Sequence, residues 1–259
     1  MTRLFVVSDC GGVGRTTVAA NLGHALAARG EVVRLRDVDP QQALAVHFQS
    51  LERTESGPVQ GSMSGPISRP LATNLSLSLE HDIEHRPGDG GHDQARLRFE
   101  SSRAADRRSS VDSEPSHTDA DTLEIIDTPC AWTAGAARTA AVDYVLCVIT
   151  PEARCFRTLP SLLSRYTTTT NNGLIRNFIG VINAHDPDSA LARDTLDLIE
   201  DALGGRLLRQ VVLRDQSLPE AFAVGLPIAE QAPWSQAANA FGQLADTFIA
   251  MKTADHVAA

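Results

Sequence analysis

The segment from Cys10 to Thr17, CGGVGRTT, lies between a short apolar run and a helical pattern, and it limits the possible folds more than any other feature. Residues 3–8 (RLFVVS) predict a strand, and the apolar spacing after Thr16 predicts a helix that ends near Gly30. Glycines between a strand and a helix let backbone N–H groups surround an anion at the positive end of the helix. The segment therefore predicts a phosphate-binding loop, with a plain glycine turn as the alternative.

Six further runs of apolar and β-branched residues predict strands, and helical stretches separate several of them. They are residues 32–36, 75–79, 123–126, 144–149, 178–182 and 210–213. Such alternation favours an α/β fold with a mostly parallel, doubly wound sheet, whose ligands bind beyond the carboxyl ends of the strands. Arg34 and Arg36 alternate along the second strand, which indicates either an edge position or carboxylate partners.

We expect a single domain over residues 1–252, interrupted by an insert at 80–121. The insert has few large apolar side chains among Ser, Asp, Arg, His, Gly and Pro, so we expect it to be disordered except for a short helix around 94–108. The four apolar positions Phe241, Leu244, Phe248 and Ile249 predict a last helix, over 234–252, that packs on the domain. Residues 253–259 are expected to form a flexible tail.

The formal net charge of -9 disfavours a nucleic-acid partner, because phosphate backbones are bound by clustered Lys and Arg. The 4 cysteines have neither paired spacing nor neighbouring histidines, which indicates reduced thiols rather than a zinc site. The apolar runs are too short for a signal peptide or a membrane span. We therefore expect a cytoplasmic protein without direct membrane insertion.

Three polar residues follow predicted strands and are candidates for the same site. Asp39 lies in Asp37-Val-Asp-Pro-Gln41, Asp127 ends the apolar run 125–126, and Asn183 follows the strand 178–182. Each residue type is also common in ordinary turns after strands, and this alternative weighs most for Asn183. Because the carboxyl ends of parallel strands share one edge, we expect all three to approach the glycine loop.

The loop resembles the deviant Walker A motif, KGGVGKTT, of the ParA/MinD family of P-loop ATPases. The resemblance implies binding of ATP or ADP with Mg²⁺ by Gly11, Gly12, Val13, Gly14, Arg15, Thr16 and Thr17, and a homodimer. It implies that Thr16 and Asp127 hold the metal, that Asp39 orients the attacking water and that Asn183 meets the adenine. Both motif lysines are replaced, by Cys10 and Arg15, which leaves hydrolysis weak or absent.

Two later segments are similar to one branch of that family, the BcsQ (YhjQ) proteins of bacterial cellulose synthase operons. They are residues 150–155 (TPEARC) and 213–230, which includes Leu213-Arg-Asp-Gln-Ser217 and Gly225-Leu-Pro-Ile-Ala-Glu230. The resemblance implies a partner in the inner-membrane cellulose synthase complex and recruitment to that membrane face or the cell pole. The alternatives are a partitioning or positioning ATPase, and a non-hydrolysing scaffold with a vestigial nucleotide site.

Overall fold

Seven parallel strands form the centre of the molecule in the computed structural model, which describes residues 1–39, 41, 43–50, 75–79, 122–128, 142–171 and 175–258. The strands are β1 (Thr2–Val7), β2 (Val32–Asp37), β3 (Leu75–Leu79), β4 (Thr122–Asp127), β5 (Val142–Ile149), β6 (Ile175–His185) and β7 (Leu207–Leu213). Their order across the sheet is β3-β2-β4-β1-β5-β6-β7. All seven predicted strands are confirmed, as is the parallel α/β sheet.

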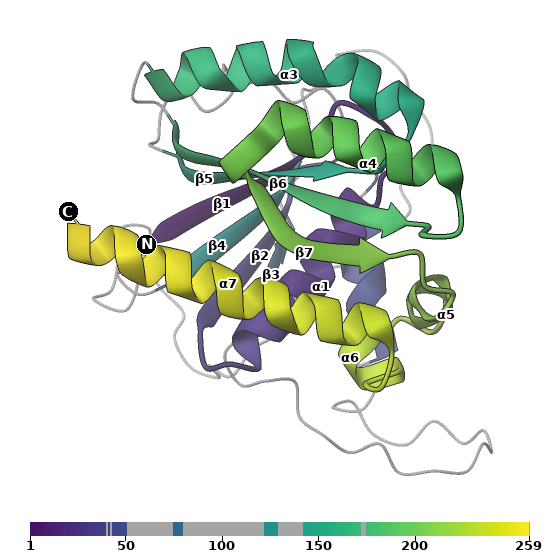
Figure 1. The fold of residues 1–259 in the computed structure, drawn as a ribbon. Coiled ribbons are helices and arrows are strands. Elements are labelled where there is room, and N and C mark those ends of the chain that lie inside the picture. The colour runs from purple at the N-terminus through teal and green to yellow at the C-terminus, as the bar shows by residue number, and fades with distance from the viewer. Residues whose placement is uncertain are drawn as a thin grey trace, which may run out of the picture.

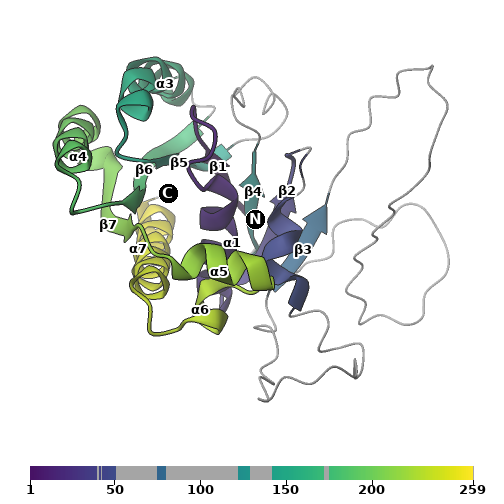
Figure 2. The ribbon, with the colours of Figure 1, turned by 90° about the vertical axis from the view of Figure 1, so that its right-hand side faces the viewer.

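Helices cover both faces of this sheet (Figures 1 and 2). Figure 2 shows α3 (Ala153–Asn171) and α4 (Ala190–Leu203) on one face, and α1 (Arg15–Ala27) and α7 (Gln236–Ala258) on the other. Shorter elements complete the chain: η1 (Ala43–Phe48), η3 (Gly204–Arg206), α5 (Ser217–Val224) and α6 (Ile228–Gln231). This is the doubly wound arrangement expected from the alternation of strands and helices.

Helix α1 is buried more completely than its predicted apolar face requires. Every residue from Val18 to Ala27 is buried, because the helix lies between the sheet and the elements α6, α7 and η1. Its contact with β2 is close: a Cβ on Gly23 would lie 2.6 Å from a methyl carbon of Leu35. The start of the helix, which carries the phosphate loop, is therefore held firmly against the sheet.

Two expectations from the sequence are wrong. Strand β2 is not an edge strand, because β3 pairs with it on the side away from β4. The last helix does not stop before a flexible tail, because α7 continues through residues 253–258. The helix does pack on the domain as predicted, since Phe241, Leu244 and Phe248 are buried and Phe248 meets Tyr144 edge to face at 5.0 Å.

The insert at 80–121, its predicted helix, Pro40, Pro129 and Cys130 lie outside the described residues. No helix in the described ranges is long and apolar enough to cross a membrane.

Candidate functional site

The glycine loop lies at the carboxyl end of β1, in the middle of the sheet, as its sequence position predicts. Gly12 and Gly14 have positive φ values of 72° and 83°, which side-chain-bearing residues rarely adopt. Gly14 then caps α1, whose first residue is Arg15, and the Val18 N–H donates to the Gly14 carbonyl at 2.9 Å. The amino terminus of a 13-residue helix thus opens toward the loop, the geometry in which backbone N–H groups bind phosphate.

Asn183 supports this loop from behind. Its Nδ2 donates to the Val13 carbonyl at 2.7 Å, and a Cβ on Gly14 would lie only 2.4 Å from the same nitrogen. The structure therefore gives Asn183 a role in shaping the phosphate loop that the sequence did not predict. Its contact with a nucleotide base stays a prediction.

The predicted metal ligands meet directly: the Thr16 hydroxyl donates to Asp127 Oδ2 at 2.6 Å. Asp127 Oδ1 is buried and has no hydrogen-bond partner among the described residues. Magnesium held between phosphates needs only one or two protein oxygens, because phosphates and waters complete its octahedron. Thr16 and Asp127 fit that role, although the described chain holds no group of three or more His, Cys, Asp or Glu side chains arranged as metal ligands.

Arg15 does not extend into the loop but reaches two carboxylates. Its Nη2 donates to Asp39 Oδ2 at 3.2 Å, and its Nε lies 3.9 Å from Asp127 Oδ1. Asp37 is buried beside them and accepts from the backbone N–H groups of Asp39 and Leu44, at 2.9 and 3.0 Å. The predicted residues Asp39, Asp127, Arg15 and Thr16 therefore form one cluster.

The charges of this cluster are incompletely balanced. Burial raises the pKa of Asp127 to about 7, with a further increase from the Asp37 and Asp39 charges, while the Thr16 hydrogen bond and Arg15 oppose it. Burial also raises the pKa of Asp37. A site with three carboxylates and one guanidinium favours an additional cation.

A cavity of about 680 Å³ opens in front of this cluster, a volume within the usual range for small-molecule sites. One end is lined by the phosphate loop from Gly12 to Thr17 together with Asp39, and Asn183 lies beside it. The other end is formed by side chains to which the sequence gave no role: Ala43, His47, Leu213, Arg214, Gln216, Leu218, Pro219 and Phe222. The similarity of residues 213–230 to one family branch was the available signal.

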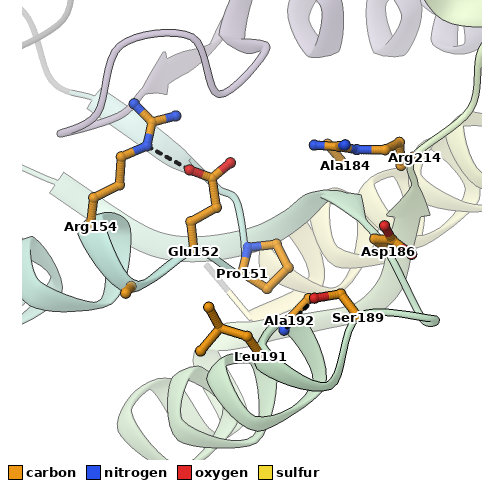
Figure 3. A pocket seen from close by; sticks show the side chains of 10 residues that line it. Pro151, Glu152, Arg154, Ala184, Asp186, Ser189, Leu191, Ala192 and Arg214 are labelled. Atoms are coloured by element: carbon orange, nitrogen blue, oxygen red, sulfur yellow. Dashed lines mark hydrogen bonds and ion pairs between the residues drawn. The ribbon is translucent and has the colours of Figure 1, made fainter.

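A second cavity of about 370 Å³ lies next to the first, between the starts of α3 and α4 (Figure 3). The two cavities share Ala184 and Arg214. Ala184 has a φ of 53°, an unusual value for a residue with a side chain, and such strain is frequent at functional sites. Arg154, which the sequence patterns did not point to, donates through Nη1 to the Gly11 carbonyl at 3.0 Å and so lies against the loop.

Cys10 lies against α3 rather than in front of the loop. Its Sγ is 3.7 Å from Thr158 Oγ1, and Cys155 is a neighbour on the same helix. Burial and the nearby Cys155 raise the pKa of the Cys10 thiol. The position therefore contributes no positive charge to the site.

His47 connects η1 to α5 at the end of the large cavity and makes folding pH-dependent. Its ring meets Phe222 edge to face at 4.9 Å, and burial lowers its pKa from 6.5 to about 4. The unfolded chain therefore binds a proton below pH 6.5 that the folded chain excludes, so stability decreases as the pH falls. We expect a loss of about 2 kcal/mol between pH 7 and pH 5 from this group.

Urea unfolding at both pH values measures this loss in the wild type and in His47→Gln. The substitution should remove about 2 kcal/mol of the pH dependence, because glutamine does not titrate. Equal pH dependence in the two proteins would contradict the assignment.

Comparison with known proteins identifies the chain. The family model described as cellulose biosynthesis protein BcsQ matches residues 1–249. The chain belongs to the BcsQ family. No curated protein matches it at a significant level.

Solved structures with the same fold are ParA and MinD proteins, to which this BcsQ-family chain is distantly similar. They include MinD in a MinC:MinD complex from Aquifex aeolicus (18% identity, TM-score 0.63, 96% of each chain covered). They also include the septum site-determining protein MinD complexed with Mg-ADP from Pyrococcus horikoshii OT3 (21%, 0.61, 95% of each). A ParA family ATPase from Chlorobium tepidum TLS shows 16% identity and a TM-score of 0.56, with 94% of this chain and 97% of that one covered. The chain is thus a divergent protein of the ParA/MinD-like P-loop fold.

Proposed function

We propose that this BcsQ-family protein binds ATP or ADP with Mg²⁺ in the cavity in front of the glycine loop. The observation that carries the proposal is the Thr16–Asp127 hydrogen bond of 2.6 Å at the start of α1, beside the positive-φ glycines and inside a cavity of about 680 Å³. Backbone N–H groups of the loop would bind phosphate. Thr16 would ligate the metal directly and Asp127 through water, while Asn183 and residues 213–222 would face the base and sugar.

Hydrolysis is expected to be slow or absent. Asp39 is the residue that would orient an attacking water, yet its Oδ2 already accepts from Arg15. The position of Cys10 supplies no cation, and P-loop catalysis depends on cations around the transferred phosphoryl group. These features favour a nucleotide-controlled switch, or a scaffold that binds nucleotide without turning it over.

The biological role that family membership supports is assistance to the cellulose synthase complex at the inner membrane. The protein would act in the cytoplasm as a homodimer, and its nucleotide state would control contacts with a component of that complex. A partitioning or positioning role is less well supported, because α7 packs on the domain rather than presenting a basic membrane-binding face.

Calorimetric titration with ATP and ADP in the presence of Mg²⁺, paired with a phosphate-release assay, tests the proposal. We expect binding of both nucleotides and little phosphate release. Absence of heat with either nucleotide would exclude a nucleotide-dependent role and leave only the vestigial scaffold. Phosphate release that depends on Asp39, tested with Asp39→Ala, would instead identify an active ATPase. Co-purification with cellulose synthase subunits from membranes of the host tests the partner.

A further inference from the structure

Arg15 occupies an unusual position between the phosphate loop and the segment that follows β2. Its backbone is the first residue of α1, directly after Gly14, and its side chain lines the large cavity together with Asp39. The exposed fractions of the Arg15 and Asp39 side chains are only 12% and 16%. The ion pair between them is therefore largely shielded from water, and such pairs are more persistent than surface pairs.

The guanidinium group uses only part of its hydrogen-bonding capacity. The edge formed by Nε and Nη2 faces the carboxylates of Asp127 and Asp39. Nη1 lies at the other end of the planar group, is buried and has no hydrogen-bond partner among the described residues. A buried charged donor without an acceptor is unfavourable, so this end of the group is available for an anion in the cavity.

We infer that Arg15 holds a nucleotide phosphate through Nη1 while Nη2 keeps its ion pair with Asp39, so that one side chain connects the phosphate to the segment 37–50. The inference rests on the proposed nucleotide site and adds a specific role for the residue that replaces the family's lysine. Lysine would not fill this role equally well, because its charge is a single compact ammonium group rather than a fork with several donors.

The segment that follows β2 is connected to the far wall of the cavity by further contacts. Asp39 accepts from the Gln41 N–H at 3.0 Å, and Asp37 joins the N–H groups of Asp39 and Leu44. Helix η1, which starts at Ala43, reaches α5 through His47 and Phe222. Ser50 N–H then donates to the Gly225 carbonyl at 3.0 Å. A phosphate bound to Arg15 would therefore stabilise both walls of the cavity.

A double-mutant cycle on ADP affinity tests the connection, with ADP chosen so that hydrolysis does not enter. In the wild-type background Arg15 neutralises Asp39, so Asp39→Asn should not tighten ADP binding. In Arg15→Lys the carboxylate loses its fork partner and repels the phosphate, so Asp39→Asn should tighten binding about fivefold. Calorimetry with constant Mg²⁺ gives the four dissociation constants.

A difference of threefold or more between the two Asp39→Asn factors supports the inference, and a smaller difference overturns it alone. Absence of ADP binding by the wild type overturns the proposed function together with the inference. If Asp39→Asn does not fold, hydrogen exchange decides: ADP should protect amides of residues 43–50 in the wild type and not in ADP-saturated Arg15→Lys. Equal protection in both proteins overturns the inference.

Discussion

Gly14→Ala is expected to weaken nucleotide binding about 30-fold and to lower the free energy of unfolding by about 2 kcal/mol. Gly14 has a φ of 83°, and a Cβ there would lie 2.4 Å from Asn183 Nδ2. Alanine therefore strains the backbone and displaces the amide that donates to the Val13 carbonyl, a hydrogen bond worth about 1 kcal/mol. Calorimetric titration with ADP and urea unfolding measure the two effects.

Gly30→Ala is the matched control for backbone strain. Gly30 has a φ of 92°, but a Cβ there would meet no described atom within 4 Å beyond its chain neighbours, and the residue is outside the cavity. We expect a loss of about 1 kcal/mol in stability and unchanged ADP affinity. A second control is Gly14→Ala combined with Asn183→Ala, which removes the clash and should recover part of the stability. Unchanged ADP binding in Gly14→Ala would exclude the loop as the phosphate site.

Thr16→Ala is expected to remove most of the Mg²⁺ dependence of nucleotide binding. The Thr16 hydroxyl donates to Asp127 Oδ2 at 2.6 Å and keeps oxygen lone pairs for a metal ion. Loss of a ligand together with its partner's orientation lowers metal affinity by about 10- to 100-fold. In the wild type, therefore, ADP should bind at least about tenfold more tightly with Mg²⁺ than with EDTA. In Thr16→Ala the two dissociation constants should agree within about twofold.

Thr17→Ala distinguishes the metal ligand from its neighbour. Both hydroxyl-bearing residues lie in the first turn of α1 and line the cavity, but only the Thr16 hydroxyl bonds to Asp127. Thr17→Ala should change ADP affinity equally with and without Mg²⁺, so the dependence on the metal is retained. Loss of the Mg²⁺ dependence in Thr17→Ala but not in Thr16→Ala would contradict the assigned ligand.

The repeating pattern of apolar residues was sufficient to predict all seven strands, because a parallel strand buried on both faces reads as a short continuous apolar run. β4 is the clearest case, since all six of its residues are buried. Arg34 and Arg36 misled the interpretation of β2. The pairing partner that places β2 inside the sheet, β3, is distant in sequence, and a local pattern does not reveal it.

The loop, the two aspartates and Asn183 were predictable because each follows a strand, and the carboxyl ends of parallel strands meet at one edge. The wall formed by His47 and Phe222 was not, since its residues come together only when η1 packs against α5. The loop contact of Arg154 has the same origin, because α3 brings this side chain beside Gly11.

The sequence CGGVGRTT by itself determined that a glycine loop joins a strand to a helix, because backbone freedom and apolar spacing are local properties. It also determined that the loop lysines are replaced. Only the tertiary structure decided where the replacing side chains go. Arg15 turns toward Asp39 and Asp127, and Cys10 turns toward Thr158, because charges and packing partners from distant segments set the direction of a side chain.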